Sequence, residues 1–144
     1  MKINLIKLKE ECKDWKEVVF KGVGLLEKEG FVNEVYKERI IENFYEFGTY
    51  MVIAPQIVLL HARAEDGVIK TGFSILTLEN PINFGSELND PVKLVFSFCS
   101  VDNKDHMVLL SNLMKLLMSK DDLENLMNEN NIENVKKIIE KFDL

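Results

Sequence analysis

The segment Val92–Cys99 constrains the fold most, because it is a nearly continuous run of apolar residues. A strand with one face in water alternates apolar and polar residues, whereas a strand buried on both faces is apolar along most of its length. The run has the length of one strand. It therefore predicts a strand that lies inside a sheet and is covered on both faces.

Three further short apolar runs come before that segment: Tyr50–Ile53, Ile57–Leu60 and Val68–Leu78. Proline and glycine residues separate the runs, and these residue types mark turns. Residues 50–99 are therefore predicted to form a sheet of short strands. The opening stretch Ile3–Leu8 is also apolar and fits either a strand or a loop packed on the core.

Amphipathic helices are predicted on both sides of this strand region along the chain. From Asp14 to Gly30, apolar residues recur mostly every three or four positions, although Gly22 and Gly24 weaken the pattern because each costs about 1 kcal/mol relative to alanine. The other predicted helices are Asn33–Gly48, His106–Met118, a segment opened by Ser119 with Asp122 three residues on, and Ile132–Phe142 after the capping residue Asn131.

The composition indicates one globular α/β domain over residues 1–144 with a mixed sheet. The chain has 144 residues, of which 47% are hydrophobic and 29% charged, and a chain of this size buries roughly two thirds of its unfolded surface. The net charge of −6 argues against nucleic acid as a partner. A cytoplasmic location is expected, because the sequence shows neither a signal-peptide core nor a run of about 20 apolar residues.

The only two histidines, His61 and His106, both lie at the ends of predicted elements. His61 follows the apolar run 57–60 where the chain turns polar, and His106 begins a predicted helix. Strand ends and helix N-termini often hold reactive groups, and a helix N-terminus suits an anion. A buried or surface histidine without a chemical role fits the local pattern at His61 equally well.

Two histidines are compatible with metal ligation, acid–base catalysis or carriage of a phosphoryl group on nitrogen. A metal would need further ligands, and the Asp and Glu residues show no ligand spacing, so no metal or other cofactor is expected. Cys12 and Cys99 are far apart and lack a Cys-x-x-Cys partner, and no nucleophile elbow or nucleotide-binding loop is present.

A phosphoryl carrier needs little more than an accessible imidazole, hydrogen-bond donors for the phosphate oxygens and a docking surface. His61 could be the nucleophile, with Arg63 as a charged donor and His106 holding the added charge. A solvated loop arginine and a helix-end histidine remain the alternatives for Arg63 and His106. Leu59, Leu60, Ile69 and the turn Met107–Leu110 are candidates for an apolar docking rim or for core positions.

At these residues the sequence resembles the IIA proteins of the bacterial sugar phosphotransferase system, within the mannitol/fructose superfamily (EIIA type 2), and is similar to the ascorbate-type members. The similarity extends over roughly residues 33–118. The matching segments are Tyr50-Met-Val-Ile-Ala-Pro55, His61-Ala-Arg63, Glu65-Asp-Gly-Val68, Lys70-Thr-Gly72, Pro81-Ile-Asn-Phe84, Asp90-Pro-Val92 and His106.

This resemblance implies a mixed β-sheet with helices on both sides and a phosphotransferase mechanism. Phospho-HPr would pass its phosphoryl group to His61, through Nε2, and His61 would pass it to the cysteine of a IIB protein. His106 would be the second active-site histidine and Arg63 a phosphate contact. The membrane IIC component would take part only indirectly, although it would select the transported sugar. The sugar and the oligomeric state are left open.

The sequence departs from the family pattern at two positions. The family usually reads Pro-His-Ala-Arg-Pro, but Leu60 precedes the histidine here and Ala64 follows the arginine. Without these prolines fewer φ angles of the loop are fixed. A phosphocarrier for sugar uptake is the main interpretation, and a IIA-like regulatory module that reports phosphorylation state is the alternative.

Overall fold

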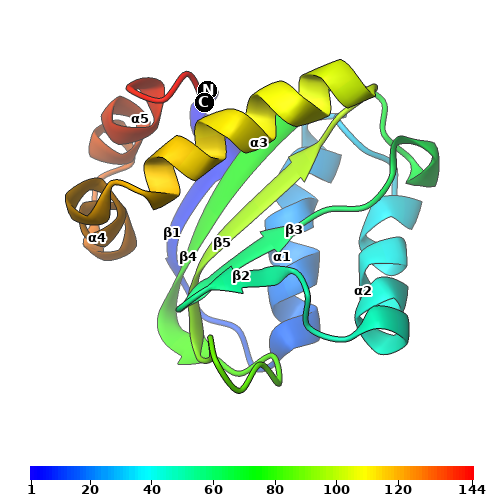
Figure 1. The fold of residues 1–144 in the computed structure, drawn as a ribbon, viewed down its shortest axis with the longest axis horizontal. Coiled ribbons are helices and arrows are strands. Elements are labelled where there is room, and N and C mark those ends of the chain that lie inside the picture. The colour runs from blue at the N-terminus through cyan, green and yellow to red at the C-terminus, as the bar shows by residue number, and fades with distance from the viewer.

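The computed structural model describes residues 1–144 and has a five-stranded mixed sheet between two layers of helices (Figure 1). None of the helices has the length and apolarity needed to cross a bilayer. The elements, in chain order, are a 3-10 turn at Ile3–Leu5, β1 (Ile6–Glu10), α1 (Trp15–Lys28), α2 (Val35–Phe47), β2 (Val52–Ala54), β3 (Ile57–Leu60), a 3-10 turn at Ala64–Asp66, β4 (Gly72–Ile82), β5 (Val92–Cys99), α3 (Asn103–Leu117), α4 (Lys120–Asn128) and α5 (Ile132–Glu140).

The strands lie in the order β1-β4-β5-β3-β2. The two pairs β1–β4 and β3–β5 are parallel, and β4–β5 and β2–β3 are antiparallel. In the β3–β5 pair, Leu60 lies opposite Ser97. The carboxyl ends of β3 and β5 therefore meet at one edge of the sheet.

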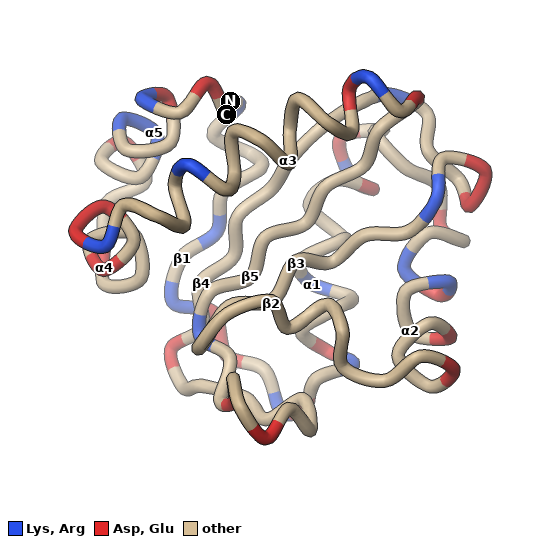
Figure 2. Tube along the Cα trace, in the orientation of Figure 1, with Lys and Arg blue, Asp and Glu red and all other residues tan.

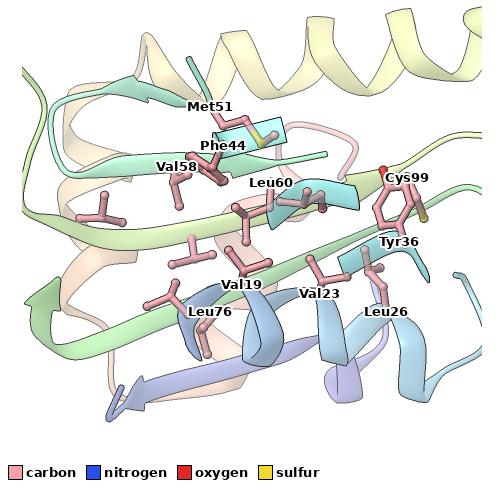
Figure 3. Close-up of a cluster of buried hydrophobic side chains, with 14 of the residues drawn as sticks. Val19, Val23, Leu26, Tyr36, Phe44, Met51, Val58, Leu60, Leu76 and Cys99 are labelled. Atoms are coloured by element: carbon pink, nitrogen blue, oxygen red, sulfur yellow. The ribbon is translucent and has the colours of Figure 1, made fainter. Parts of the chain in front are cut away.

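Neighbouring residues along a strand point to opposite faces of the sheet, and both faces of this sheet are buried. On one face, Val58, Leu60 and Val95 pack against α1 and α2 (Figure 3). On the other face, Leu59 and Phe96 pack against side chains of α3, α4 and α5. Figure 1 shows α1 and α2 behind the sheet and α3 crossing in front of it. The predicted α/β fold with helices on both sides is confirmed.

Charged residues are concentrated on the helices, the loops and the edge strand β1 (Figure 2). The central part of β5 and all of β3 carry none. Each large apolar side chain that is fully buried there contributes about 1.5–3 kcal/mol relative to an exposed one. The buried sheet therefore provides an apolar support for the residues that follow the carboxyl ends of β3 and β5.

Strands β3 and β5 occupy the predicted ranges, but β4 does not. It runs from Gly72 to Ile82, whereas Val68–Leu78 was predicted. The amides of Ile69 and Lys70 donate to the carbonyl oxygen of Phe31 rather than to a neighbouring strand. At the other end the strand continues past Pro81, which is tolerated because the pairing with β5 is irregular there.

The helices α1, α3 and α5 begin where an acidic or amide side chain accepts a hydrogen bond from a backbone amide of the first turn. Asp14 accepts from the amide of Glu17 at the start of α1. Asp102 accepts from the amide of Asp105, so α3 begins three residues before the predicted start at His106. As a result His106 lies on the first turn of α3 rather than at its first residue.

Candidate functional site

The two histidines come together at the carboxyl edge of the sheet. His61 directly follows β3, and β5 leads through Ser100–Asp102 into the first turn of α3. Because β3 and β5 are neighbouring parallel strands, the segments that follow their carboxyl ends lie side by side. The ring centroids of His61 and His106 are 6.5 Å apart. The sequence predicted that both histidines lie at element ends, and the parallel pairing makes them neighbours.

Phe98, near the end of β5, contacts both imidazoles. Its ring is stacked on that of His61, with the centroids 5.1 Å apart and the planes 19° apart, and it lies 5.1 Å from the ring of His106. Sequence reasoning missed this role, because Phe98 is one of several apolar residues in a buried strand. Its place beside the strand end was the only available signal. Tyr50 approaches His61 from another side, edge-on, at 6.2 Å.

The imidazole of His61 is held in one orientation by its own strand. Nδ1 lies 2.9 Å from the carbonyl oxygen of Leu59. A carbonyl oxygen can only accept, so Nδ1 carries the proton and Nε2 keeps a free lone pair when the ring is neutral. Burial lowers the pKa of His61, the bond to Leu59 opposes this shift, and His106 adds to it. The ring is therefore neutral, with Nε2 nucleophilic, near pH 7.

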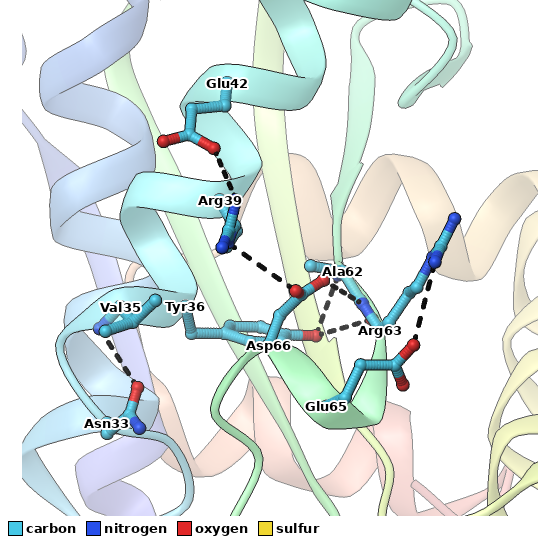
Figure 4. A network of polar contacts seen from close by, with 9 residues as sticks. All are labelled: Asn33, Val35, Tyr36, Arg39, Glu42, Ala62, Arg63, Glu65 and Asp66. Carbon is cyan, nitrogen blue, oxygen red and sulfur yellow. Dashed lines mark hydrogen bonds and ion pairs between the residues drawn. The ribbon is translucent and has the colours of Figure 1, made fainter.

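The loop after His61 is fixed by the side chain of Asp66. Its Oδ2 accepts from the amide of Arg63 at 3.1 Å, and its Oδ1 lies 3.7 Å from Nε of Arg39 (Figure 4). The guanidinium of Arg63 is mostly exposed and only 3.7 Å from the exposed carboxylate of Glu65. Since an exposed pair of this kind contributes little, Arg63 can turn toward an anion at low cost.

An open pocket surrounds the two histidines. Its walls come from α2, the loop after His61 and the loop before α3; among the lining residues are Arg39, Asn43, Tyr50, Arg63, Asp102 and Asn103. Sequence reasoning did not identify Arg39 as a pocket residue, because the charged residues of an amphipathic helix lie mostly on its solvent-facing side. Its position one turn from Tyr36 on an amphipathic helix gave no sign that the pocket would lie there.

The first turn of α3 is attached to β4 by Thr71. The Thr71 hydroxyl donates to Oδ2 of Asp105 at 2.7 Å and accepts from the amide of Val101 at 3.1 Å. Asp105 immediately precedes His106. These two bonds therefore fix the backbone that presents the second imidazole.

Two residues considered for a docking rim belong to the core: Leu59 and Leu60 are 2% and 0% exposed. Ile69 and Met107 are both largely exposed, as are Phe47 and Tyr50 on the α2 side. No three His, Cys, Asp or Glu side chains are grouped so as to hold a metal ion. The site therefore combines a nucleophilic nitrogen, two guanidinium groups and a helix N-terminus, which together suit the transfer of an anionic group.

Residues 1–142 match the family described as phosphoenolpyruvate-dependent sugar phosphotransferase system, EIIA 2. The chain is 43% identical over 103 residues to the ascorbate-specific PTS system EIIA component of Salmonella typhi. The aligned residues cover 72% of this chain and 67% of that protein. It is 38% identical over 120 residues to the component of the same description from Escherichia coli strain K12, covering 83% of this chain and 77% of that one.

Solved structures of IIA proteins have the same fold. The solution structure of the mannitol-specific cryptic phosphotransferase enzyme IIA CmtB from Escherichia coli has a TM-score of 0.87 at 28% identity, over 96% of this chain and 93% of that chain. Enzyme IIA in its complex with phosphorylated enzyme IIB of the Escherichia coli mannitol system has a TM-score of 0.85 at 21% identity, over 98% and 97% of the two chains.

The fold and the sequence relatives together define a phosphotransferase of the sugar phosphotransferase system, a class of proteins that carry phosphoryl groups on histidine. The chain belongs to the EIIA type 2 family of that phosphoenolpyruvate-dependent system. The family resemblance inferred from the sequence is confirmed.

Proposed function

We propose that His61 is the residue that carries the phosphoryl group, on its Nε2 atom. The observation that supports this proposal most strongly is the 2.9 Å contact between Nδ1 of His61 and the carbonyl oxygen of Leu59. This contact leaves Nε2 as the only ring nitrogen with a free lone pair. Burial keeps the ring neutral, and the open pocket gives a donor access to it.

In the transfer step, the Nε2 lone pair forms a bond to phosphorus while the bond between phosphorus and the donor breaks. The donor's leaving atom keeps that electron pair. The imidazole becomes positively charged when its lone pair is shared, and the Leu59 carbonyl stabilises this charge through the Nδ1 proton. In the second step, a thiolate of the acceptor attacks phosphorus and His61 returns to its neutral form. No proton has to move to or from Nδ1 in either step.

Arg63 and His106 support this transfer in the proposal. Phosphoryl transfer depends mainly on positioning and on stabilising the charge of the phosphate oxygens. Arg63 supplies a mobile guanidinium beside the loop, and His106 supplies a second imidazole 6.5 Å from the first. Arg39, which also lines the pocket, is already paired with Glu42 at 2.9 Å and with Asp66 at 3.7 Å, so in the proposal it holds the loop and does not bind the phosphate.

We propose phospho-HPr as the donor and the cysteine of a cognate IIB protein as the acceptor, with residues 1–144 acting as one EIIA domain in the cytoplasm. The E. coli complex contains a IIA protein bound to phosphorylated IIB, which supports this kind of partner. The exposed side chains of Phe47, Tyr50, Ile69 and Met107 offer an apolar docking rim. The relatives from Salmonella and E. coli support ascorbate as the transported compound.

The direct test is to incubate the protein with phosphoenolpyruvate, enzyme I and HPr and to measure its intact mass. One phosphate-sized increase is expected for the wild type and none for His61→Ala. A wild type that gains no phosphate would remove the carrier function, and phosphate on the His61→Ala protein would move the site elsewhere. Adding the cognate IIB protein should discharge the label, whereas a module that only reports phosphorylation state would keep it.

His106→Ala should leave the fold intact and slow the transfer to IIB. An oriented donor to a developing charge contributes on the order of 10²-fold to a rate. Lys104→Ala is the matched control, because Lys104 is exposed on the same turn of α3. Equal transfer rates for the two variants in rapid-quench experiments would show that His106 has no part in the reaction.

A further inference from the structure

Tyr36 is a fully buried tyrosine of α2 whose hydroxyl reaches the two strand ends that form the site. Its Oη lies 2.8 Å from the carbonyl oxygen of Phe98. It also lies 3.2 Å from the carbonyl oxygen of Ala62, and the amide of Ala62 donates to it at 2.9 Å (Figure 4). Ala62 directly follows His61, and Phe98 is the residue stacked on the His61 ring.

The hydroxyl has only one proton, so it donates fully to one carbonyl. The shorter contact indicates that the hydroxyl donates to the carbonyl oxygen of Phe98. A lone pair of the hydroxyl oxygen then accepts the hydrogen bond from the amide of Ala62. Burial raises the pKa of Tyr36, so the hydroxyl stays protonated at every pH at which the protein functions. One side chain thereby connects a donor of the His61 loop with an acceptor of β5.

This connection begins where the sheet hydrogen bonding stops. The parallel pairing of β3 and β5 ends with Leu60 opposite Ser97, one residue before His61 and one before Phe98. Beyond that point no strand pairing fixes the distance between the two backbones. The Tyr36 hydroxyl bridges them just beyond that pair, between Ala62, two residues after Leu60, and Phe98, one residue after Ser97. It does so without proline on either side of the His61-Ala-Arg63 segment.

We propose that Tyr36 is a positioning residue for phosphoryl transfer: it holds the backbone after His61 against that of Phe98 and so fixes the direction of the His61 lone pair. This inference rests on the proposed function of His61. Tyr36 itself does not reach the pocket and contacts no reacting atom. Its effect should therefore appear in the rate of transfer and in the environment of the imidazole, not in partner affinity.

The test is Tyr36→Phe, which keeps the ring and removes the hydroxyl. We expect kcat for transfer from the phosphorylated protein to IIB to fall about tenfold or more, because small misplacements of reacting groups cost up to about 10²-fold. KM for IIB should change less than twofold. The NMR titration midpoint of His61 should rise toward the ordinary histidine value, because the loosened loop exposes the ring to water.

Two controls separate positioning from general stability. Tyr45→Phe removes a hydroxyl from the exposed side of the same helix and should leave the rate unchanged. Ile40→Val shortens a fully buried side chain one turn further along α2, in the same core, and lowers stability while keeping the Tyr36 hydroxyl and its hydrogen-bond partners. A kcat for Tyr36→Phe within twofold of wild type would overturn the proposal. So would an equal loss of kcat in Ile40→Val at a similar Tm.

The titration of His61 is independent of phosphorylation. If the wild type accepted no phosphate, the proposed function would fail. An unchanged His61 midpoint in Tyr36→Phe would overturn the positioning role as well, whereas a raised midpoint would keep it as a structural property of the loop.

Discussion

The ring of Phe98 lies nearly parallel to the imidazole of His61, with their centroids 5.1 Å apart. Phe98 is only 3% exposed, so it forms the apolar floor on which the imidazole rests. Desolvation is the main cause of the lowered pKa of His61. The stacked ring therefore contributes to keeping His61 neutral as well as oriented.

Phe98→Leu should raise the pKa of His61 and slow phosphoryl transfer, because leucine covers less of the imidazole and offers no flat surface. The loss of the aromatic contact should also cost about 0.5–1.5 kcal/mol of stability. NMR titration of the His61 ring protons measures the first effect. Phe84→Leu is a suitable control, since Phe84 is a buried aromatic residue that packs against Trp15 and Phe44, away from the two histidines. Identical His61 titration in wild type and Phe98→Leu would argue against this role.

The stability of the protein should decrease as the pH falls below about 6.5, the histidine pKa of an unfolded chain. The folded-state pKa of His61 is lowered, so between these two values the unfolded chain binds more protons than the folded one. The free energy of unfolding then falls by at most about 1.4 kcal/mol per pH unit for this group and levels off below the folded pKa. Above pH 6.5 the penalty is absent.

Urea unfolding at pH 7.5 and at pH 5.5 measures this dependence. His61→Gln is the reference, because it removes the titrating group and keeps a polar side chain of similar length. The wild type should lose more stability over this interval than His61→Gln. The same loss in both proteins would mean that other groups cause the pH dependence.

Two glycines of α1 should respond oppositely to alanine. A Cβ at Gly22 would lie 3.1 Å from Cγ1 of Val95 and 3.3 Å from Cδ1 of Leu60, whereas one at Gly24 would meet nothing within 4 Å. Gly24→Ala should therefore stabilise the protein by about 1 kcal/mol through helix propensity. Gly22→Ala gains the same propensity but overpacks the core at a cost of about 1–3 kcal/mol.

The two glycine variants are compared by chemical denaturation. Gly24→Ala should unfold at higher urea concentration than the wild type and Gly22→Ala at the same or lower concentration. If Gly22→Ala proved as stabilising as Gly24→Ala, the packing of α1 on β3 and β5 would have room for a methyl group at Gly22, and the overpacking cost would be absent.

Ala64→Pro should stabilise the protein by about 0.4–1 kcal/mol. Ala64 is the first residue of a 3-10 turn, where the amide lacks a partner within the turn, and Arg63 before it has φ −79° and ψ 158°, which a following proline allows. Arg63→Pro is the contrasting variant, because it removes the amide that donates to Asp66. Thermal unfolding should show a higher Tm for Ala64→Pro and a lower one for Arg63→Pro; the reverse order would contradict the loop geometry.

Much of the fold follows from local patterns. The strands at 57–60 and 92–99 could be predicted to the residue, because unbroken apolar runs end there in polar or turn-forming residues. The predicted start of the helix at 103–117 was three residues too late. The polar residues from Asp102 to Asp105 are typical of a loop, and only the structure shows that Asp102 caps the amide of Asp105. The strand at 72–82 was shifted because Val68 and Ile69 are apolar yet bind the loop around Phe31.

The sequence by itself determined the layered fold, the family and the two histidines, since these depend on residue types and on their order along the chain. Only the tertiary structure decided how the site is assembled. The parallel pairing of β3 and β5 brings His61, His106 and Phe98 together. The packing of α2 adds Tyr36 and Arg39, which no local pattern singled out. Contacts between residues this far apart in the chain are set by the packing of whole helices and strands. The sequence pattern of a buried residue is the same whether its side chain only fills the core or also supports the site.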